Sequence, residues 1–117
     1  MLIPGFYTIL GREKQDEQTY MFRFTLNSEA DVYRGHFPGN PIAPGVCSLQ
    51  MIKECLQSVL SRETLRLSTI KQCRFSCLLR PSEKDLQLEI KLLDEAWFTA
   101  QIMDDDQVCM KIKAQYN

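Results

Sequence analysis

A short segment rich in glycine and proline is the feature of this sequence that most restricts its fold. Most of the chain's five Gly and five Pro residues lie between Gly35 and Gly45. A run of good helix formers without Gly or Pro follows, from Val46 to about Leu60. Pro44 stands where the first turn of a helix tolerates a missing N–H group. The sequence therefore predicts a rigid turn that leads directly into a helix.

This helix is expected to be mostly buried. At about 100° per residue, its apolar side chains gather on one face and its polar side chains form a narrow strip. The apolar face comprises Leu49, Ile52, Leu56, Val59 and Leu60, with Cys47 and Met51 roughly opposite, and the strip comprises Gln50, Lys53, Glu54 and Gln57.

The rest of the chain is predicted to form strands. Apolar and polar residues alternate over 20–26, 75–79, 86–92, 96–102 and 108–114, with turns expected at 81–85, 94–95 and 104–106. Four strands in succession after the helix indicate an antiparallel sheet. One long buried helix requires this sheet to wrap around it. We therefore expect a single α+β domain over 1–117 with the hotdog fold, an antiparallel β-sheet wrapped around a long central helix.

Charge and composition exclude several classes of protein. The 14 Lys and Arg residues against 15 Asp and Glu residues give a net charge of -1, which provides no basic field for nucleic acid or an anionic membrane. The sequence contains no apolar run of about 18 residues and its start does not resemble a secretion signal. We expect a cytoplasmic protein without nucleic-acid or membrane partners.

The cysteines and the single histidine make a metal site improbable. The five cysteines form an odd set without a CxxC pair, and only one histidine is present to help bind a metal. We expect all five thiols to be reduced and to act as small apolar side chains. The run Asp104-Asp105-Asp106 lacks the spacing of a calcium loop and is expected to be a solvated turn. The sequence thus predicts neither a metal nor a cofactor.

His36 is the strongest candidate for a reactive residue. It precedes the Pro/Gly turn that leads into the helix, so a group able to accept a proton near pH 7 is expected close to the free N–H groups of a helix N-terminus. These N–H groups can stabilise an oxyanion. The alternative is a histidine that only packs beside a tight turn.

The residues around His36 resemble a known signature. His36, Phe37, Pro38, Gly39, Pro41, Pro44 and Gly45 match the segment that precedes the central helix in the 3-hydroxyacyl-[acyl carrier protein] dehydratases of bacterial fatty acid synthesis. Arg74-Phe75 followed by Pro81 and Asp85 is similar to a second, weaker motif of that family. The resemblance implies the hotdog fold, a homodimer or higher homo-oligomer, and a tunnel at the subunit interface for an acyl chain carried by acyl carrier protein.

The resemblance also implies a reaction and roles for individual residues. The family removes water from a 3-hydroxyacyl thioester to give a trans-2-enoyl thioester. His36 matches the base that takes the C2 proton, and the Gly45 N–H matches the donor to the thioester carbonyl. Phe37, Pro44, Val46 and Phe75 are the corresponding candidates for substrate binding.

The sequence departs from the family at the third catalytic role. The family places an acid, which the partner subunit supplies to the site, where this chain has Gln50, and an amide cannot donate a proton as an acid does. Glu54 stands one helical turn later, on the same face of the helix. Our hypothesis is that Glu54 is the acid, with its protonated form favoured by burial, and that Gln50 orients the hydroxyl or a water. The alternative is a partly solvated helix carboxylate.

Three functions remain open at this point. The first is an active dehydratase. The second is a weak or inactive homologue that binds acyl thioesters or pairs with an active subunit, because Gln50 leaves the acid position vacant. The third, less favoured, is a thioesterase of the same fold, for which the His-Phe-Pro-Gly segment is not needed.

Overall fold

The structure, a computed structural model, describes residues 5–27 and 45–117. His36, Phe37 and Pro44 lie outside the described residues. The elements in chain order are β1 (Tyr7–Lys14), β2 (Thr19–Leu26), α1 (Gly45–Leu60), β3 (Leu67–Phe75), β4 (Ser82–Leu92), the short 3-10 helix η2 (Asp94–Ala96), β5 (Trp97–Asp104) and β6 (Gln107–Tyr116).

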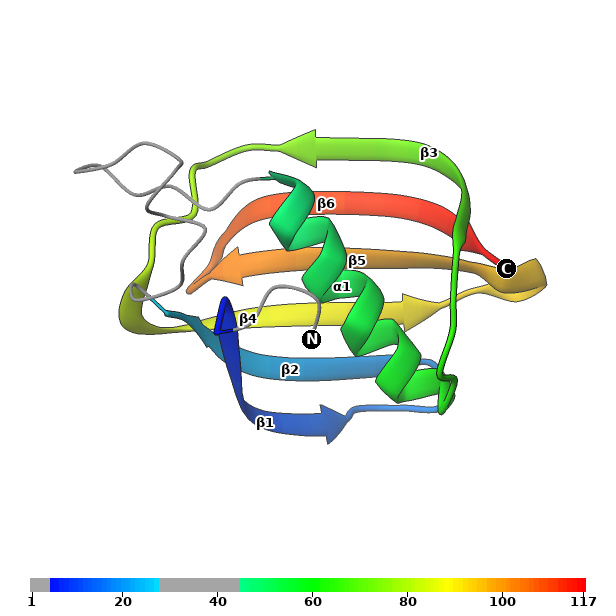
Figure 1. The fold of residues 1–117 in the computed structure, drawn as a ribbon, viewed down its shortest axis with the longest axis horizontal. Coiled ribbons are helices and arrows are strands. Elements are labelled where there is room, and N and C mark those ends of the chain that lie inside the picture. The colour runs from blue at the N-terminus through cyan, green and yellow to red at the C-terminus, as the bar shows by residue number, and fades with distance from the viewer. Residues whose placement is uncertain (1–4, 28–44) are drawn as a thin grey trace.

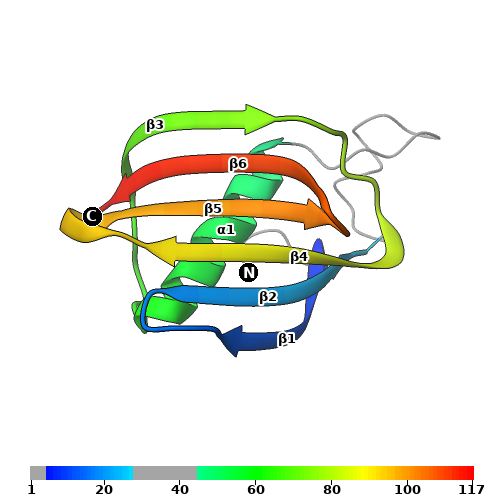
Figure 2. The same ribbon diagram turned by 180° about the vertical axis from the view of Figure 1, so that it is seen from behind.

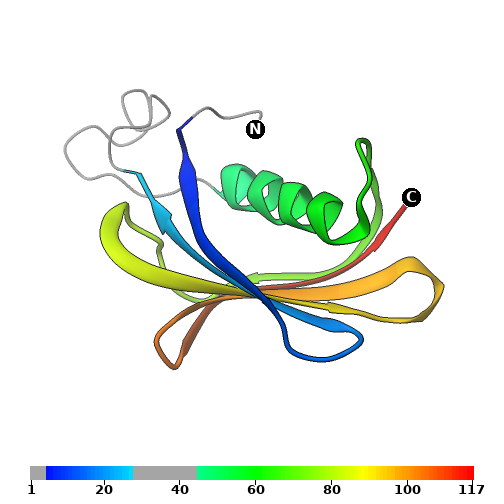
Figure 3. The ribbon, with the colours of Figure 1, turned by 90° about the horizontal axis from the view of Figure 1, so that it is seen from below.

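The six strands form one antiparallel sheet in the order β1-β2-β4-β5-β6-β3. Helix α1 lies across one face of this sheet (Figure 1), and the opposite face carries no helix in the described part of the chain (Figure 2). The sheet curves around the helix (Figure 3). This is the predicted hotdog fold, and the α+β class is confirmed.

The core lies between the concave face of the sheet and α1. Strands β2, β4, β5 and β6 alternate between buried and less buried residues, as the sequence predicts, and their inward side chains meet the helix. Burial of one such large apolar side chain contributes roughly 1.5–3 kcal/mol. The fully buried members include Phe24, Ile52, Leu56, Leu88, Ile90, Phe98, Ile102, Met110 and Ile112.

The buried face of α1 differs in part from the predicted one. Ile52 and Leu56 are buried as expected, but Cys47 and Met51 are buried too, together with Cys55. Both flanks of the helix therefore pack against the curved sheet, because a sheet that wraps around a helix covers more than one narrow stripe.

The predicted strand over 75–79 is wrong, and the predicted turn over 81–85 is placed too late. Strand β3 ends at Phe75, and β4 already begins at Ser82. Between them, Cys77 is partly buried and Leu79 is buried, which produces a short alternation without a strand. Strands β1 and β3 were not predicted. Both lie at the edges of the sheet and are exposed along most of their length, so neither shows the alternation of a half-buried strand.

Two of the five cysteines are not reduced thiols. Cys77 and Cys109 form a disulfide that joins the segment after β3 to strand β6, so the expectation of five free thiols is wrong for this pair. Cys47 and Cys55 are free and buried, as small apolar side chains are expected to be, whereas Cys73 is free and exposed on β3.

The acidic run forms the tip of the β5–β6 hairpin, as predicted. Lys84 Nζ lies 2.6 Å from Asp104 Oδ1 and 2.9 Å from Asp105 Oδ2. These contacts raise the pKa of Lys84 above its ordinary value. A single cation of the chain therefore contacts two of the three aspartates at this turn and offsets part of their negative charge.

Candidate active site

The N-terminus of α1 is packed closely against the end of β3. A Cβ atom added at Gly45 would lie 2.9 Å from Cζ of Phe75, so the ring of Phe75 occupies the space that any larger residue would need. Phe75 is 53% exposed and Val46 is 73% exposed. Three of the predicted site residues, Gly45, Val46 and Phe75, thus lie at one end of the helix beside an uncovered apolar surface.

Gln50 and Glu54 meet on the polar strip of the helix. Gln50 Nε2 donates a hydrogen bond of 3.2 Å to Glu54 Oε2. The i,i+4 spacing had indicated this proximity, because residues four apart share a helix face. Both side chains are partly buried. The amide at the family's acid position therefore touches the carboxyl group that we expect to replace it.

Tyr7 completes this group and was not predicted. Its hydroxyl donates a hydrogen bond of 2.7 Å to Glu54 Oε1. Tyr7 is only 8% exposed, and its burial, followed by the bond to Glu54, raises its pKa above the ordinary value. The Tyr7 hydroxyl is therefore a neutral hydrogen-bond donor throughout the physiological pH range. No pattern in the sequence connects Tyr7 with Glu54, since 47 positions separate them.

A second contact joins β1 to the helix one turn beyond Glu54. Arg12 Nη1 donates a hydrogen bond of 2.8 Å to Ser58 Oγ, and the guanidinium of Arg12 lies 5.5 Å from the centre of the Tyr20 ring. Cys55, which follows Glu54 on the helix, is buried, and this burial is the main reason that its pKa is raised to about 12. Strand β1 is thus fixed to α1 at two points.

A hollow of about 380 Å³ opens beside Gln50 and Glu54. The polar strip of α1 forms one wall, and the segment that follows the helix forms the other. Its lining comprises Gln50, Lys53, Glu54, Gln57, Glu63, Thr64 and Leu65. The Gln50–Glu54 pair therefore borders open space that a reactant or a second subunit can enter.

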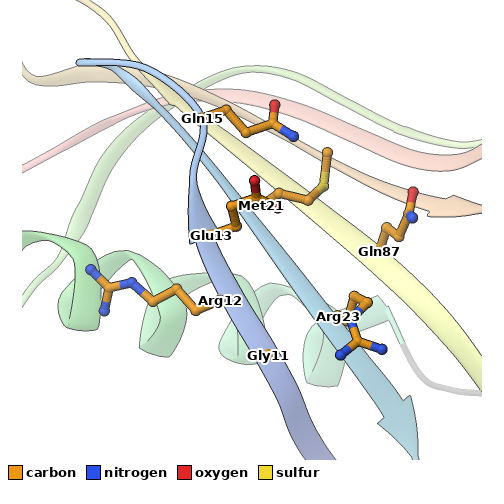
Figure 4. Close-up of a pocket in the computed structure, with 7 residues that line it drawn as sticks. All are labelled: Gly11, Arg12, Glu13, Gln15, Met21, Arg23 and Gln87. Carbon is orange, nitrogen blue, oxygen red and sulfur yellow. The ribbon is translucent and has the colours of Figure 1, made fainter.

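A larger hollow lies elsewhere, over β1, β2 and β4. Its volume is about 510 Å³, and its lining includes Gly11, Met21, Arg23 and Gln87 (Figure 4). Arg23 forms an ion pair of 3.1 Å with Asp85. None of the predicted site residues that the structure describes borders this hollow. Two arginines line it, and both already have partners, since Arg12 bonds Ser58 and Arg23 pairs with Asp85.

One helix carries both ends of the candidate site, and they lie far apart. At a rise of about 1.5 Å per residue, Glu54 is about 14 Å along the axis from Gly45. Within one chain, the N–H of Gly45 and the carboxyl of Glu54 therefore do not face the same small group.

Among the described residues, no group of three or more His, Cys, Asp or Glu side chains could hold a metal ion. None of the helices in the same part of the chain is long and apolar enough to cross a membrane.

Comparison with known proteins identifies the family. The family model described as "ApeI-like: ApeI dehydratase" matches residues 12–113. The chain belongs to the ApeI-like dehydratase family. This match spans α1 and all strands apart from the first part of β1 and the end of β6.

Individual proteins of known sequence or structure agree with the family assignment. The 3-hydroxyacyl-[acyl-carrier-protein] dehydratase FabZ of Levilactobacillus brevis is 33% identical over 94 residues, which are 70% of this chain and 62% of that protein. The FabZ of Lactiplantibacillus plantarum is 26% identical over 104 residues, 80% of this chain and 70% of that protein. The chain thus matches less than two thirds of the length of the first relative.

The fold of this ApeI-like chain also matches a solved dehydratase. The dehydratase heterocomplex ApeI:P from Xenorhabdus doucetiae contains a chain with a TM-score of 0.82 and 25% identity. The match covers 93% of this chain and 96% of that one. The two chains therefore share the whole architecture.

Proposed function

We propose that this ApeI-like protein is a 3-hydroxyacyl-thioester dehydratase, which removes water from an acyl chain carried by acyl carrier protein and gives a trans-2-enoyl thioester. The observation that carries this proposal is the Gln50–Glu54 pair, which lies on the central helix of a dehydratase family and borders an open hollow. The names of the related FabZ proteins support the substrate class. We expect the reaction to belong to fatty acid synthesis or a related acyl-chain pathway.

The proposed reaction distributes two proton transfers between two groups. His36 takes the proton from C2, and the Gly45 N–H stabilises the enolate charge that develops on the thioester oxygen. Glu54 donates its proton to the hydroxyl at C3, which leaves as water while the C2–C3 double bond forms. Gln50 holds the carboxyl group of Glu54 in place. We assign contacts with the acyl chain to Phe37, Pro44, Val46 and Phe75.

A complete site in this proposal requires two subunits. The axial separation of about 14 Å between Gly45 and Glu54 supports a site in which the acid comes from the partner. The edge strand β3 supports a place for the contact, because no other described strand pairs with its outer side and Ile70 is 48% exposed. We therefore propose a homodimer formed along β3.

The proposal includes a cytoplasmic location, where carrier-protein thioesters would be the substrate. The Cys77–Cys109 disulfide is unusual for that compartment, because cytosolic reductants keep most thiols reduced. The thiol content of protein taken directly from lysed cells, with free thiols blocked at lysis, tests this part of the proposal. Five blocked cysteines would support the cytoplasmic location and mean that the disulfide forms only after lysis, whereas three blocked cysteines would contradict this location.

Reversible hydration of a trans-2-enoyl thioester, followed by its ultraviolet absorbance, tests the reaction. We expect activity in the wild type and a loss of about 100-fold or more in His36→Ala and in Glu54→Gln, the usual range for a lost general acid or base. Glu89→Gln is the matched control, since Glu89 lies in the middle of β4 and bonds Gln101 instead. An inactive wild type that gains activity on Gln50→Glu would identify a binding or partner subunit and refute the proposal.

A further inference from the structure

The carboxyl group of Glu54 is held from two different elements. Tyr7 of β1 donates to Oε1 at 2.7 Å, and Gln50 of α1 donates to Oε2 at 3.2 Å. The two donors differ in whether they can also accept a hydrogen bond from a protonated Glu54. An amide side chain can also accept a hydrogen bond when it turns over, because its oxygen and nitrogen lie on opposite sides. The Tyr7 hydroxyl lies in a buried position, where it keeps its proton.

These differences bear on where a protonated Glu54 carries its proton. If Tyr7 continues to donate to Oε1, that oxygen stays an acceptor and the proton resides on Oε2. A turn of the Gln50 amide then allows its oxygen to accept the Oε2–H group. Gln50 and Glu54 both border the hollow, whereas Tyr7 does not. The proton of Glu54 is thereby confined to Oε2, whose hydrogen-bond partner Gln50 borders the hollow.

We propose that Tyr7 is a positioning residue for the dehydration, which orients Glu54 so that the transferable proton sits on Oε2. The inference rests on the proposed function. When the proton passes from Oε2 to the departing hydroxyl, the O–H bond of Glu54 breaks and water leaves. The carboxylate that remains then accepts hydrogen bonds from Tyr7 and Gln50, as it does in the structure.

A structural role alone is the competing explanation for the Tyr7 contact, and the chain offers a matched control. The bond from Arg12 to Ser58 also ties β1 to α1, one helical turn beyond Glu54, and its length of 2.8 Å is similar. Ser58→Ala removes that tie without touching Glu54. A residue that only fixes β1 to the helix should therefore behave like Ser58.

The kinetic test uses Tyr7→Phe, which keeps the ring and removes the hydroxyl. We expect kcat to fall about tenfold or more with KM changed less than about twofold, since the general acid is misplaced while the binding surface is intact. Ser58→Ala should keep the wild-type kcat. In a Glu54→Gln background, Tyr7→Phe should cause no further loss, because a residue that acts through Glu54 has nothing left to orient. An unchanged kcat in Tyr7→Phe, or an equal loss in both backgrounds, overturns the inference.

A second readout does not depend on activity. The ¹³C NMR signal of the Glu54 carboxyl carbon, assigned by its loss in Glu54→Gln, should move in Tyr7→Phe and stay in place in Ser58→Ala. A signal that does not move in Tyr7→Phe overturns the inference even if the protein is an active dehydratase. An inactive wild type refutes the proposed dehydration and the role of Tyr7 in it, and a moved signal would then establish the contact alone.

Discussion

Loss of the Cys77–Cys109 disulfide should lower the free energy of unfolding by about 4 kcal/mol. The bond joins residues with a sequence separation of 32. In the chain-entropy description, closing a loop of this length removes about 12 cal/mol/K from the unfolded chain, which is about 4 kcal/mol at 25 °C. Domains of this size have a total free energy of unfolding of about 5–15 kcal/mol. Reduction should therefore remove a large part of the stability.

Urea unfolding, followed by the fluorescence of the chain's single tryptophan, measures this change. With a slope of about 2 kcal/mol per molar urea, the midpoint should fall by about 2 M when a reductant is present. The double variant Cys77→Ala/Cys109→Ala should unfold at the low midpoint with or without reductant, and Cys73→Ala should behave like the wild type. A wild-type midpoint that reductant does not change would refute the reasoning, as would five titratable thiols in the unfolded, unreduced protein.

Three further outcomes follow from burial and exposure. Phe98→Ala empties a fully buried position in the middle of the sheet and should lower the free energy of unfolding by about 3–5 kcal/mol in the same urea assay. At pH 9, Cys55 should not react with iodoacetamide in the folded protein, because burial raises its pKa to about 12, but should be modified after unfolding in urea, as mass spectrometry would show. Ile70→Lys places a charge on the exposed side of β3 and should shift the proposed dimer to monomer in sedimentation, and an unchanged dimer would place the contact elsewhere.

Much of the fold could be predicted because its central elements bury one face. The alternation of β2, β4, β5 and β6 and the composition of α1 are direct consequences of the core between them. The edge strands β1 and β3 have no such pattern, since few of their side chains enter the core. The disulfide could not be predicted either, because the spacing of five cysteines does not determine which of them pair.

The candidate site was only partly accessible to sequence reasoning. The contact between Gln50 and Glu54 follows from helical spacing, and the structure contains it. The approach of Tyr7 depends on how β1 packs beside the helix, which no local pattern encodes. The same holds for the close packing of Phe75 against Gly45, where residues from different elements meet. His36 stays a prediction, as do the roles assigned to all these residues.

The two edges of the sheet differ in their capacity to extend it. Along β1, the pairing with β2 is interrupted between Ile9 and Gly11, and the strand ends in Arg12, Glu13 and Lys14. An irregular, charged edge is a poor template for another strand. If only the β3 edge accepts a neighbour, two copies that pair there have each used their single open edge. Such an assembly closes at two members by symmetry and cannot grow into a fibre by adding strands.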